Sequence, residues 1–422
     1  MNMKKILSII ISITVGASIN AQQLEKFISE NIDRAAGNLH TYEIIDYSDA
    51  KAPKGYKPFY ISHYSRHGSR YHSSESFYTK TIAKLTECER QSLLTDDGKY
   101  LLNTLRKLKS EHEGMFGYLT QVGSRQQQEI AQRMFDNYPS VFKNKDNKII
   151  YAVSSKSERC IQSMANFCTT MKGCNPSLQV QYYTGKRYMK YISHSFDISY
   201  QHKLKHHICD SILHADFNGN RLMAKTFTDV KKAHKIIGSR YIFKSIFDEL
   251  AISQNLDAEI PDLLKTYFTI PELAAFARSD NARYYATWCI TEEFGDKYVQ
   301  GVGGPLPKKM IEEADEAIKG NGHAADVRFG HDSALMPLYP LLGIEDFPVR
   351  HEAEAGEIWH MGKYMCMASN LQLIFFKNKE GDILVKLRRN ESDVNIPALK
   401  AVSGPFYSWN EFRNYALDRI SL

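Results

Sequence analysis

Cysteine is scarce in this chain, and its cysteines show none of the spacings that hold a metal ion. Seven cysteines among 422 residues are few and odd in number, so a dense disulfide framework is not expected, although one or two bridges are compatible with a location outside the cytoplasm. No CxxC pair has the spacing of a zinc site, and no HExxH pair marks a zinc protease. Metal-based catalysis therefore has no support in the sequence.

Signals for nucleic-acid binding and for membrane spans are also missing. The net charge of +6 at pH 7 is a mild basic excess, and no basic arm or RNP-type motif accompanies it. Such an excess is typical of an ordinary solvated surface and is compatible with a basic pocket for a small anion. Beyond residue 21 no apolar stretch approaches the roughly 20 residues that cross a bilayer. We expect no nucleic-acid partner and no membrane span after the first residues.

The first residues have the three-part layout of a secretory signal peptide. Lys4 and Lys5 precede an uncharged apolar run, and small residues follow as far as Ala21. We expect cleavage near Ala21 and a periplasmic or secreted protein. A retained membrane anchor is the alternative, and the shortness of the apolar run disfavours it.

Strand-like and helix-like stretches alternate in the first part of the chain. Aromatic and β-branched residues predict a buried strand from Phe59 to Tyr64, which leads to Gly68, and a second strand over residues 149–153. Apolar spacing predicts helices over residues 95–111 and 119–135. This alternation favours a parallel or mixed α/β sheet. The helix after the second strand is predicted to turn the following residues inward: Ile161, Met164, Ala165 and Cys168.

The middle of the chain differs from both ends. Residues 183–305 are mainly helical in pattern, polar, and rich in histidine and lysine, so we expect an inserted α-helical cap. A short strand follows and ends at Gly330, and a β-hairpin around Gly381 is predicted near the C-terminus. The expected fold is α/β, with a mixed sheet sandwiched by helices and a mainly helical cap. The expected segments are a signal peptide (1–21), two parts of an α/β core (22–182 and 306–422) and the insert (183–305).

The strongest local motif is the run from Arg66 to Arg70, RHGSR, directly after the first predicted strand. The carboxyl end of a sheet strand is the usual place for a ligand. Guanidinium groups bind a phosphoryl group in bidentate fashion, and the imidazole of His67 can attack its phosphorus as a nucleophile. Gly68 allows the sharp turn that brings both arginines round. The structural alternative is a basic turn that pairs with nearby acids.

A second motif, His331-Asp332, follows the strand that ends at Gly330. An ester oxygen leaves more easily when it receives a proton, and Asp332 can supply one if bound phosphate raises its pKa. The alternative for Asp332 is a helix cap or a surface acid. Arg159 lies just past the strand 149–153 and can complete a phosphate cradle, although alone it is more typical of a surface side chain. Because fixed guanidinium groups replace the cationic role of magnesium, we expect no metal or organic cofactor.

These motifs resemble, in their order along the chain, the acid phosphatase and phytase branch of the histidine phosphatase superfamily. The resemblance rests on RHGSR, on LTQVG and SSKSER each before a helix, and on the later His-Asp. It implies that His67 is the nucleophile and Asp332 the proton donor. It also implies that four residues hold the phosphate: Arg66, Arg70, Arg159 and His331.

A finer similarity involves the multiple inositol polyphosphate phosphatases, which remove phosphates from phytate and related molecules. YKPFYISHYSRHGSRY near the start, and MASNLQLIFFKN with ILVKLRRNES near the end, resemble that subfamily. The subfamily usually carries His-Ala-Glu, whereas this chain has His331, Asp332 and Ser333, so its acid lies one residue earlier, as in the broader branch. GKRYMKYISHSF resembles a segment that faces the pocket, which makes Lys190 and His194 candidate contacts for distal phosphates.

The expected function is hydrolysis of inositol polyphosphates through a phosphohistidine, and three alternatives remain. One is a broad-specificity histidine acid phosphatase that acts on small phosphate monoesters. A second is a phosphoglycerate-mutase-type transferase, which the predicted export disfavours. The third belongs to another class, a non-catalytic binding protein for phosphorylated ligands. The presence of both His67 and Asp332 disfavours this last alternative. In every case the expected partner is an anionic phosphorylated small molecule.

Overall fold

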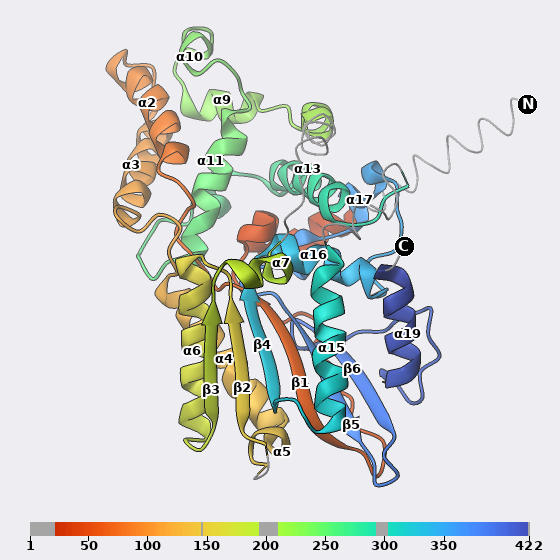
Figure 1. The fold of residues 1–422 in the computed structure, drawn as a ribbon. Coiled ribbons are helices and arrows are strands. Elements are labelled where there is room, and N and C mark those ends of the chain that lie inside the picture. The colour runs from red at the N-terminus through yellow and green to blue at the C-terminus, as the bar shows by residue number, and fades with distance from the viewer. Residues whose placement is uncertain (1–21, 145–146, 194–209, 293–302, 421–422) are drawn as a thin grey trace, which may run out of the picture.

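One eight-stranded sheet runs through the computed structural model, which describes residues 22–144, 147–193, 210–292 and 303–420 (Figure 1). The predicted signal peptide lies outside the described residues. The strand order is β3-β2-β4-β1-β5-β6-β7, with β8 paired to β6. The strands are β1 (Lys57–Arg66), β2 (Ile149–Ser154), β3 (Gln179–Thr184), β4 (Ala325–Gly330), β5 (Asn370–Lys377), β6 (Ile383–Arg389), β7 (Ser392–Asp393) and β8 (Phe406–Ser408).

The sheet is mixed, as the alternation in the sequence predicts. Strands β3, β2, β4 and β1 are parallel neighbours, whereas β5 and β6 form the predicted antiparallel hairpin and β5 pairs with β1. The carboxyl ends of the four parallel strands therefore meet at one edge, where the predicted motifs begin.

Helices cover both faces of the sheet because apolar side chains alternate along the strands. Ile61 and Ile374 face α4 and α6, whereas Tyr60 and Phe375 face α15, α16 and α19. The helices of the core are α4 (Gln121–Asn137), α5 (Pro139–Phe142), α6 (Glu158–Cys174), α15 (Pro305–Lys319), α16 (Asp332–Leu341) and α19 (Trp409–Ile420), with the shorter η1 (Ile32–Leu39), η2 (Lys186–Tyr188), α7 (Met189–Ile192), α17 (Glu352–Ile358) and α18 (Met361–Tyr364). The predicted α/β fold is confirmed.

A helical layer lies beyond the carboxyl ends of the parallel strands, above the arrowheads of β2, β3 and β4 in Figure 1. Its helices share one apolar cluster. Two of them come from residues 76–111, ahead of the predicted insert, so the layer draws on two separate stretches of chain. Its members are α2 (Ser76–Arg90), α3 (Asp96–Glu111), α9 (Asn220–Thr226), α10 (Val230–Ile237), α11 (Ile242–Ala251), η3 (Ile252–Asn255), α12 (Leu263–Tyr267) and the first turns of α13 (Ile270–Trp288).

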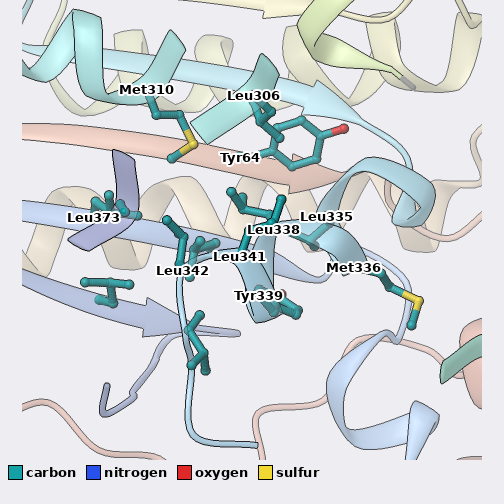
Figure 2. Packing of buried hydrophobic residues seen from close by; sticks show 14 of the residues in the cluster. Tyr64, Leu306, Met310, Leu335, Met336, Leu338, Tyr339, Leu341, Leu342 and Leu373 are labelled. Atoms are coloured by element: carbon teal, nitrogen blue, oxygen red, sulfur yellow. The ribbon is translucent and has the colours of Figure 1, made fainter. Parts of the chain in front are cut away.

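Helix α16 is anchored by its buried leucines. Leu335, Leu338 and Leu341 are 0% exposed and belong to the cluster that includes Tyr64 of β1 and Leu373 of β5. Figure 2 shows these side chains gathered between α16 and the sheet. Burial of each leucine stabilises the fold by about 1.5–3 kcal/mol. The first residue of α16 therefore has a fixed place beside the end of β1.

The inward face of α6 differs from the predicted one. Ile161 is 36% exposed and Ala165 is also exposed, whereas Met164 and Cys168 are buried as predicted. Ser163 lies on the buried face, where its Oγ accepts a hydrogen bond from the backbone N–H of Gly68 at 3.1 Å. Six residues form the buried face: Cys160, Ser163, Met164, Phe167, Cys168 and Met171.

Other described features bear on covalent and membrane organisation. Five cysteines in the described part of the chain are free thiols: Cys88, Cys160, Cys168, Cys174 and Cys366. No helix among the described residues is long and apolar enough to cross a membrane.

The RHGSR loop is packed against the first turn of α4 through two glycines. A Cβ atom at Gly123 would lie 2.1 Å from the carbonyl oxygen of Ser69, and one at Gly68 would lie 2.4 Å from the carbonyl oxygen of Gly123. Both contacts are between backbones, which cannot rotate away. The close approach of loop and helix therefore requires glycine at both positions.

We predict that Gly123→Ala destabilises the protein by about 1–3 kcal/mol, because the clash outweighs the gain in helix propensity. Urea unfolding at equilibrium measures the change. Gly173→Ala in α6 is the matched control, since a Cβ atom there meets nothing within 4 Å, and it should be neutral or stabilising by up to about 1 kcal/mol. Equal unfolding free energies for the two variants would contradict the packing argument.

Candidate active site

Parallel pairing of β1 with β4 brings the two predicted motifs together. Arg66 pairs with Gly330 in register, and the N–H of His67 donates to the carbonyl of Gly330 at 3.0 Å. The next residues along each strand, His67 and His331, then lie side by side, with ring centroids 5.7 Å apart and ring planes at 72°. On the other side of β4, the N–H of Ser155 after β2 donates to Phe329. Three segments distant in the sequence thus form one site.

His67 is held as a neutral imidazole with one free ring nitrogen. It is 2% exposed, and its Nδ1 lies 2.9 Å from the carbonyl oxygen of Gly68. A carbonyl only accepts, so Nδ1 carries the proton and Nε2 keeps its lone pair. Burial, followed by the charges of Arg66 and Arg159, holds the pKa of His67 well below its usual range. The unprotonated Nε2 has the form that a nucleophile requires.

Arg66 is fixed by backbone carbonyls. Its Nη1 donates to Asn38 at 2.6 Å and to Met365 at 2.8 Å, with Cys366 at 3.1 Å, and its Nη2 lies 3.2 Å from Asp332 Oδ2. The guanidinium is almost fully buried. Its position is therefore set before any ligand binds.

Arg70 and Arg159 keep more of their donors open. Arg70 Nη1 donates to the carbonyl of Tyr71 at 3.0 Å, and burial together with neighbouring arginines lowers its pKa to about 10, so it stays charged at neutral pH. Arg159 Nη1 donates to the carbonyl of Gly117 at 3.3 Å. Its Nε is buried and has no hydrogen-bond partner among the described residues. These unused N–H groups suit a bound oxyanion.

His331 is oriented by two serines that the sequence analysis did not single out. Its Nε2 lies 3.0 Å from Ser155 Oγ and 3.3 Å from Ser157 Oγ, and its Nδ1 lies 3.5 Å from Arg159 Nη2. Burial and the charge of Arg159 lower its pKa to about 4. Both serines belong to SSKSER, so the motif itself contained the signal. Lys156, between them, is exposed.

Asp332 is the first residue of α16 and contacts the same cluster. Its Oδ1 accepts the backbone N–H of Ser333 at 2.9 Å, and its Oδ2 accepts from Asn38 Nδ2 at 3.1 Å and pairs with Arg66. Burial raises its pKa, but the charge of Arg66 and the hydrogen bond from Asn38 outweigh this and lower it to about 2. In this surrounding of protein groups, Asp332 is ionised at neutral pH. A bound phosphoryl group adds negative charge and raises the pKa.

The structure brings all six predicted catalytic and phosphate-binding residues into one cluster. Of the two predicted substrate contacts, Lys190 in α7 lines a small cavity with Ser193 and Ala334, which lies two residues past Asp332. His194 lies outside the described residues. Within those residues, no group of three or more His, Cys, Asp or Glu side chains is placed to hold a metal ion.

Two further residues of the site, Asn38 and Tyr284, carry no sequence motif. Asn38 is the next-to-last residue of η1, and its Nδ2 lies 2.6 Å from Tyr284 Oη of α13 and 3.1 Å from Asp332. Asn38 and Tyr284 come together beside Asp332 because η1 packs against α13, so no local pattern could identify them.

Comparison with known proteins supports the fold and the class of this chain. Residues 64–207 match the model of the histidine phosphatase superfamily (branch 2). No curated protein sequence matches the chain. A multiple inositol polyphosphate phosphatase from Bifidobacterium longum, solved with inositol hexasulfate, superposes with a TM-score of 0.77 at 17% identity, covering 91% of this chain and 97% of that one. The phytase from D. castellii superposes with a TM-score of 0.66 at 14% identity, covering 93% and 86%.

A phytase from Citrobacter braakii is also similar, with a TM-score of 0.55 at 11% identity and coverage of 86% of this chain and 98% of that one. At these identities the similarities establish the fold. Taken with the family match, the fold makes this chain a histidine-type phosphatase. The segment that matches branch 2 of the superfamily, residues 64–207, contains both RHGSR and Arg159.

We predict that sulfate binds more tightly as the pH falls from about 7 to about 5. Sulfate does not titrate over this range, whereas a bound dianion raises the lowered pKa values of His67, His331 and Asp332. Binding therefore takes up protons, and proton uptake strengthens binding at lower pH. Calorimetry in two buffers of different ionisation enthalpy counts these protons. The Asp332→Asn variant should take up fewer protons when sulfate binds. A wild-type sulfate affinity that does not change between about pH 7 and about pH 5 would contradict the prediction.

Proposed function

We propose that this protein is a phosphomonoesterase that hydrolyses inositol polyphosphates such as phytate through a phosphohistidine intermediate. One observation carries the proposal. The neutral His67, with Nδ1 held by Gly68, lies in a cluster of guanidinium groups that also contains a carboxyl group, Asp332. This arrangement combines a nucleophile, an anion cradle and an acid in one site.

The first half-reaction transfers the phosphoryl group to the protein. Arg66, Arg70 and Arg159 bind the equatorial oxygens and offset their charge. His67 Nε2 donates its lone pair to phosphorus as the ester P–O bond breaks. The bonding electrons pass to the leaving oxygen, which takes the proton of Asp332 and departs as an alcohol.

The second half-reaction returns the protein to its starting state. A water molecule attacks the phosphohistidine and gives a proton to the Asp332 carboxylate, which now acts as a base. The P–N bond breaks, its electron pair returns to Nε2 of His67, and inorganic phosphate leaves. The low pKa of Asp332, about 2, keeps it ionised once the alcohol has gone, and the charge of the phosphoryl group on His67 raises this pKa and so makes the carboxylate a stronger base.

Three features support an inositol polyphosphate as the substrate. The segments around RHGSR and near the C-terminus resemble the multiple inositol polyphosphate phosphatases, and the similar Bifidobacterium protein was solved with inositol hexasulfate. Lys156 is exposed between two serines that contact His331. Together with Lys190 it offers positive charge beyond the phosphate cradle. Such charge suits a substrate with several phosphates.

The proposal extends to location. The signal-like residues up to Ala21 support action outside the cytoplasm. The free cysteines of the described part of the chain are neutral evidence, since export does not require disulfides.

We predict that kcat/KM for phytate exceeds that for 2-glycerol phosphate by about tenfold or more, because additional phosphates gain binding energy from the surrounding lysines. Phosphate release from both substrates, with the inositol phosphate isomers resolved by chromatography, measures the preference. A clear preference for the simple monoester would overturn the inositol polyphosphate assignment. It would favour the broad-specificity acid phosphatase and leave the phosphohistidine mechanism intact.

We predict that His67→Ala lowers kcat by about 10³-fold or more on both substrates, since no neighbour can replace the nucleophile. An alkaline quench of wild type during turnover should trap phosphate on histidine, and the variant should trap none. His234→Ala is the matched control, because His234 is exposed on α10. This variant should keep its activity and should still trap phosphate on histidine. Trapped phosphohistidine in His67→Ala would mean that another residue is the nucleophile.

A further inference from the structure

The carboxyl group of Asp332 is held by a pair of residues outside every motif. Asn38 Nδ2 lies 3.1 Å from Asp332 Oδ2 and 2.6 Å from Tyr284 Oη. The three residues come from η1, α16 and α13, so three separate elements meet at this carboxyl group. No other amide side chain of the described residues is recorded in contact with Asp332.

The hydrogen-bonding capacity of the three groups fixes their orientation. An ionised carboxylate only accepts, so the amide must present its NH₂ side to Asp332. One N–H of Asn38 then serves Asp332, and the other serves the Tyr284 hydroxyl. Burial raises the pKa of Tyr284 against the opposing charge of Arg283, so this hydroxyl keeps its proton. Rotation of the amide would break both bonds at once.

Arg66 closes a ring of contacts around the same atom. Its Nη1 donates to the backbone carbonyl of Asn38 at 2.6 Å, and its Nη2 lies 3.2 Å from Asp332 Oδ2. The neighbouring carbonyl, that of Leu39, accepts from Asn255 Nδ2 at 2.7 Å. The end of η1 is therefore fixed from two sides, and Asn38 cannot drift away from Asp332 without loss of the Arg66 bond.

The two carboxyl oxygens of Asp332 consequently differ. Oδ2 faces two donors, Asn38 Nδ2 and Arg66 Nη2, whereas among the described residues Oδ1 accepts one hydrogen bond, from the backbone N–H of Ser333. An oxygen that already accepts from two N–H groups, one of them charged, is the poorer site for a proton.

We propose that Asn38, oriented by Tyr284, is a positioning residue that anchors Oδ2 of Asp332, so that the proton for the leaving group is carried on Oδ1. The inference rests on the donor role that the proposed function gives Asp332. Asn38 touches no reacting atom and acts through Asp332. Tyr284 makes this anchor depend on α13, whose first turns belong to the helical layer.

Proton donation matters most when the leaving group is a poor one. The alkoxide of glycerol needs a proton, whereas 4-nitrophenolate leaves as a stable anion. Loss of the anchor should therefore impair hydrolysis of 2-glycerol phosphate far more than that of 4-nitrophenyl phosphate. A general loss of structure would impair both substrates alike.

The experiment compares kcat/KM for the two substrates in Asn38→Ala and Tyr284→Phe, because kcat/KM includes phosphoryl transfer to His67 but not the later hydrolysis. For Asn38→Ala we expect a loss of about tenfold or more on 2-glycerol phosphate and below about threefold on 4-nitrophenyl phosphate. Tyr284→Phe should show the same selectivity to a smaller extent. Tyr285→Phe is the matched control: its hydroxyl, on the same helix, donates to the carbonyl of Pro348 instead, and the substrate ratio should not change.

A second variant keeps the test valid if Asn38→Ala fails to fold. Asn38→Asp preserves the shape but places a second carboxyl group beside Asp332, which should raise the pKa of Asp332 and move the alkaline limb of kcat to higher pH. The other titratable or charged groups that act on or near Asp332 are Arg66, His331, Arg70, Tyr284, Tyr64 and Cys160, and all are retained in this variant.

The outcomes separate the inference from the proposed function. Equal losses on both substrates, with the alkaline limb in its wild-type place, would overturn the role of Asn38. Asp332→Asn is the reference, since it should lose activity selectively on 2-glycerol phosphate. If Asp332→Asn loses equal activity on the two substrates, the proposed donor role of Asp332 is overturned. That result would stand independently of the results for the Asn38 variants.

Discussion

The parallel pairing of β1 with β4 is the constraint on which the site depends. Because parallel strands end at the same edge, the register that places Arg66 opposite Gly330 also places His67 beside His331. A shift by one residue would turn the side chains of β1 to the opposite face of the sheet. The leucines of α16 fix the element that follows β4, and so fix Asp332 as well.

A second constraint is electrostatic. Three arginines gather around two histidines at the strand ends, and Asp332 forms an ion pair with one of these arginines, Arg66. Burial and this excess of positive charge lower the pKa values of His67, Arg70 and His331 together. The like charges of these groups repel one another, which disfavours protonation of the histidines. A bound anion offsets this repulsion, so the site favours anion binding. Anion binding and histidine nucleophilicity thus have one physical cause.

Local patterns predicted where the site lies. Strands with a buried pattern, each followed by a polar or basic run, placed His67, Arg159 and His331 at the strand ends of one sheet, where they converge. The pattern alone did not assign a role to Arg159, which came from the resemblance to a family. The inward face of α6 was predicted only in part. The prediction placed Ile161 on this face, whereas the buried stripe begins one residue earlier, at Cys160, and includes Ser163, a polar residue that a search for apolar spacing does not select. Asn38 and Tyr284 lacked any local signal, since packing between distant elements alone brings them to Asp332.

The position of the acid also follows from these contacts. Asp332 occupies the first turn of α16, where the positive end of the helix dipole and the N–H of Ser333 favour a carboxylate. Its short side chain reaches Asn38 and Arg66 directly. A glutamate one residue later would begin about 100° further round the helix and extend one methylene further, so it would not meet this anchor. The position of Asp332 directly after His331 therefore lets its carboxyl group contact both Asn38 of η1 and Arg66 of β1.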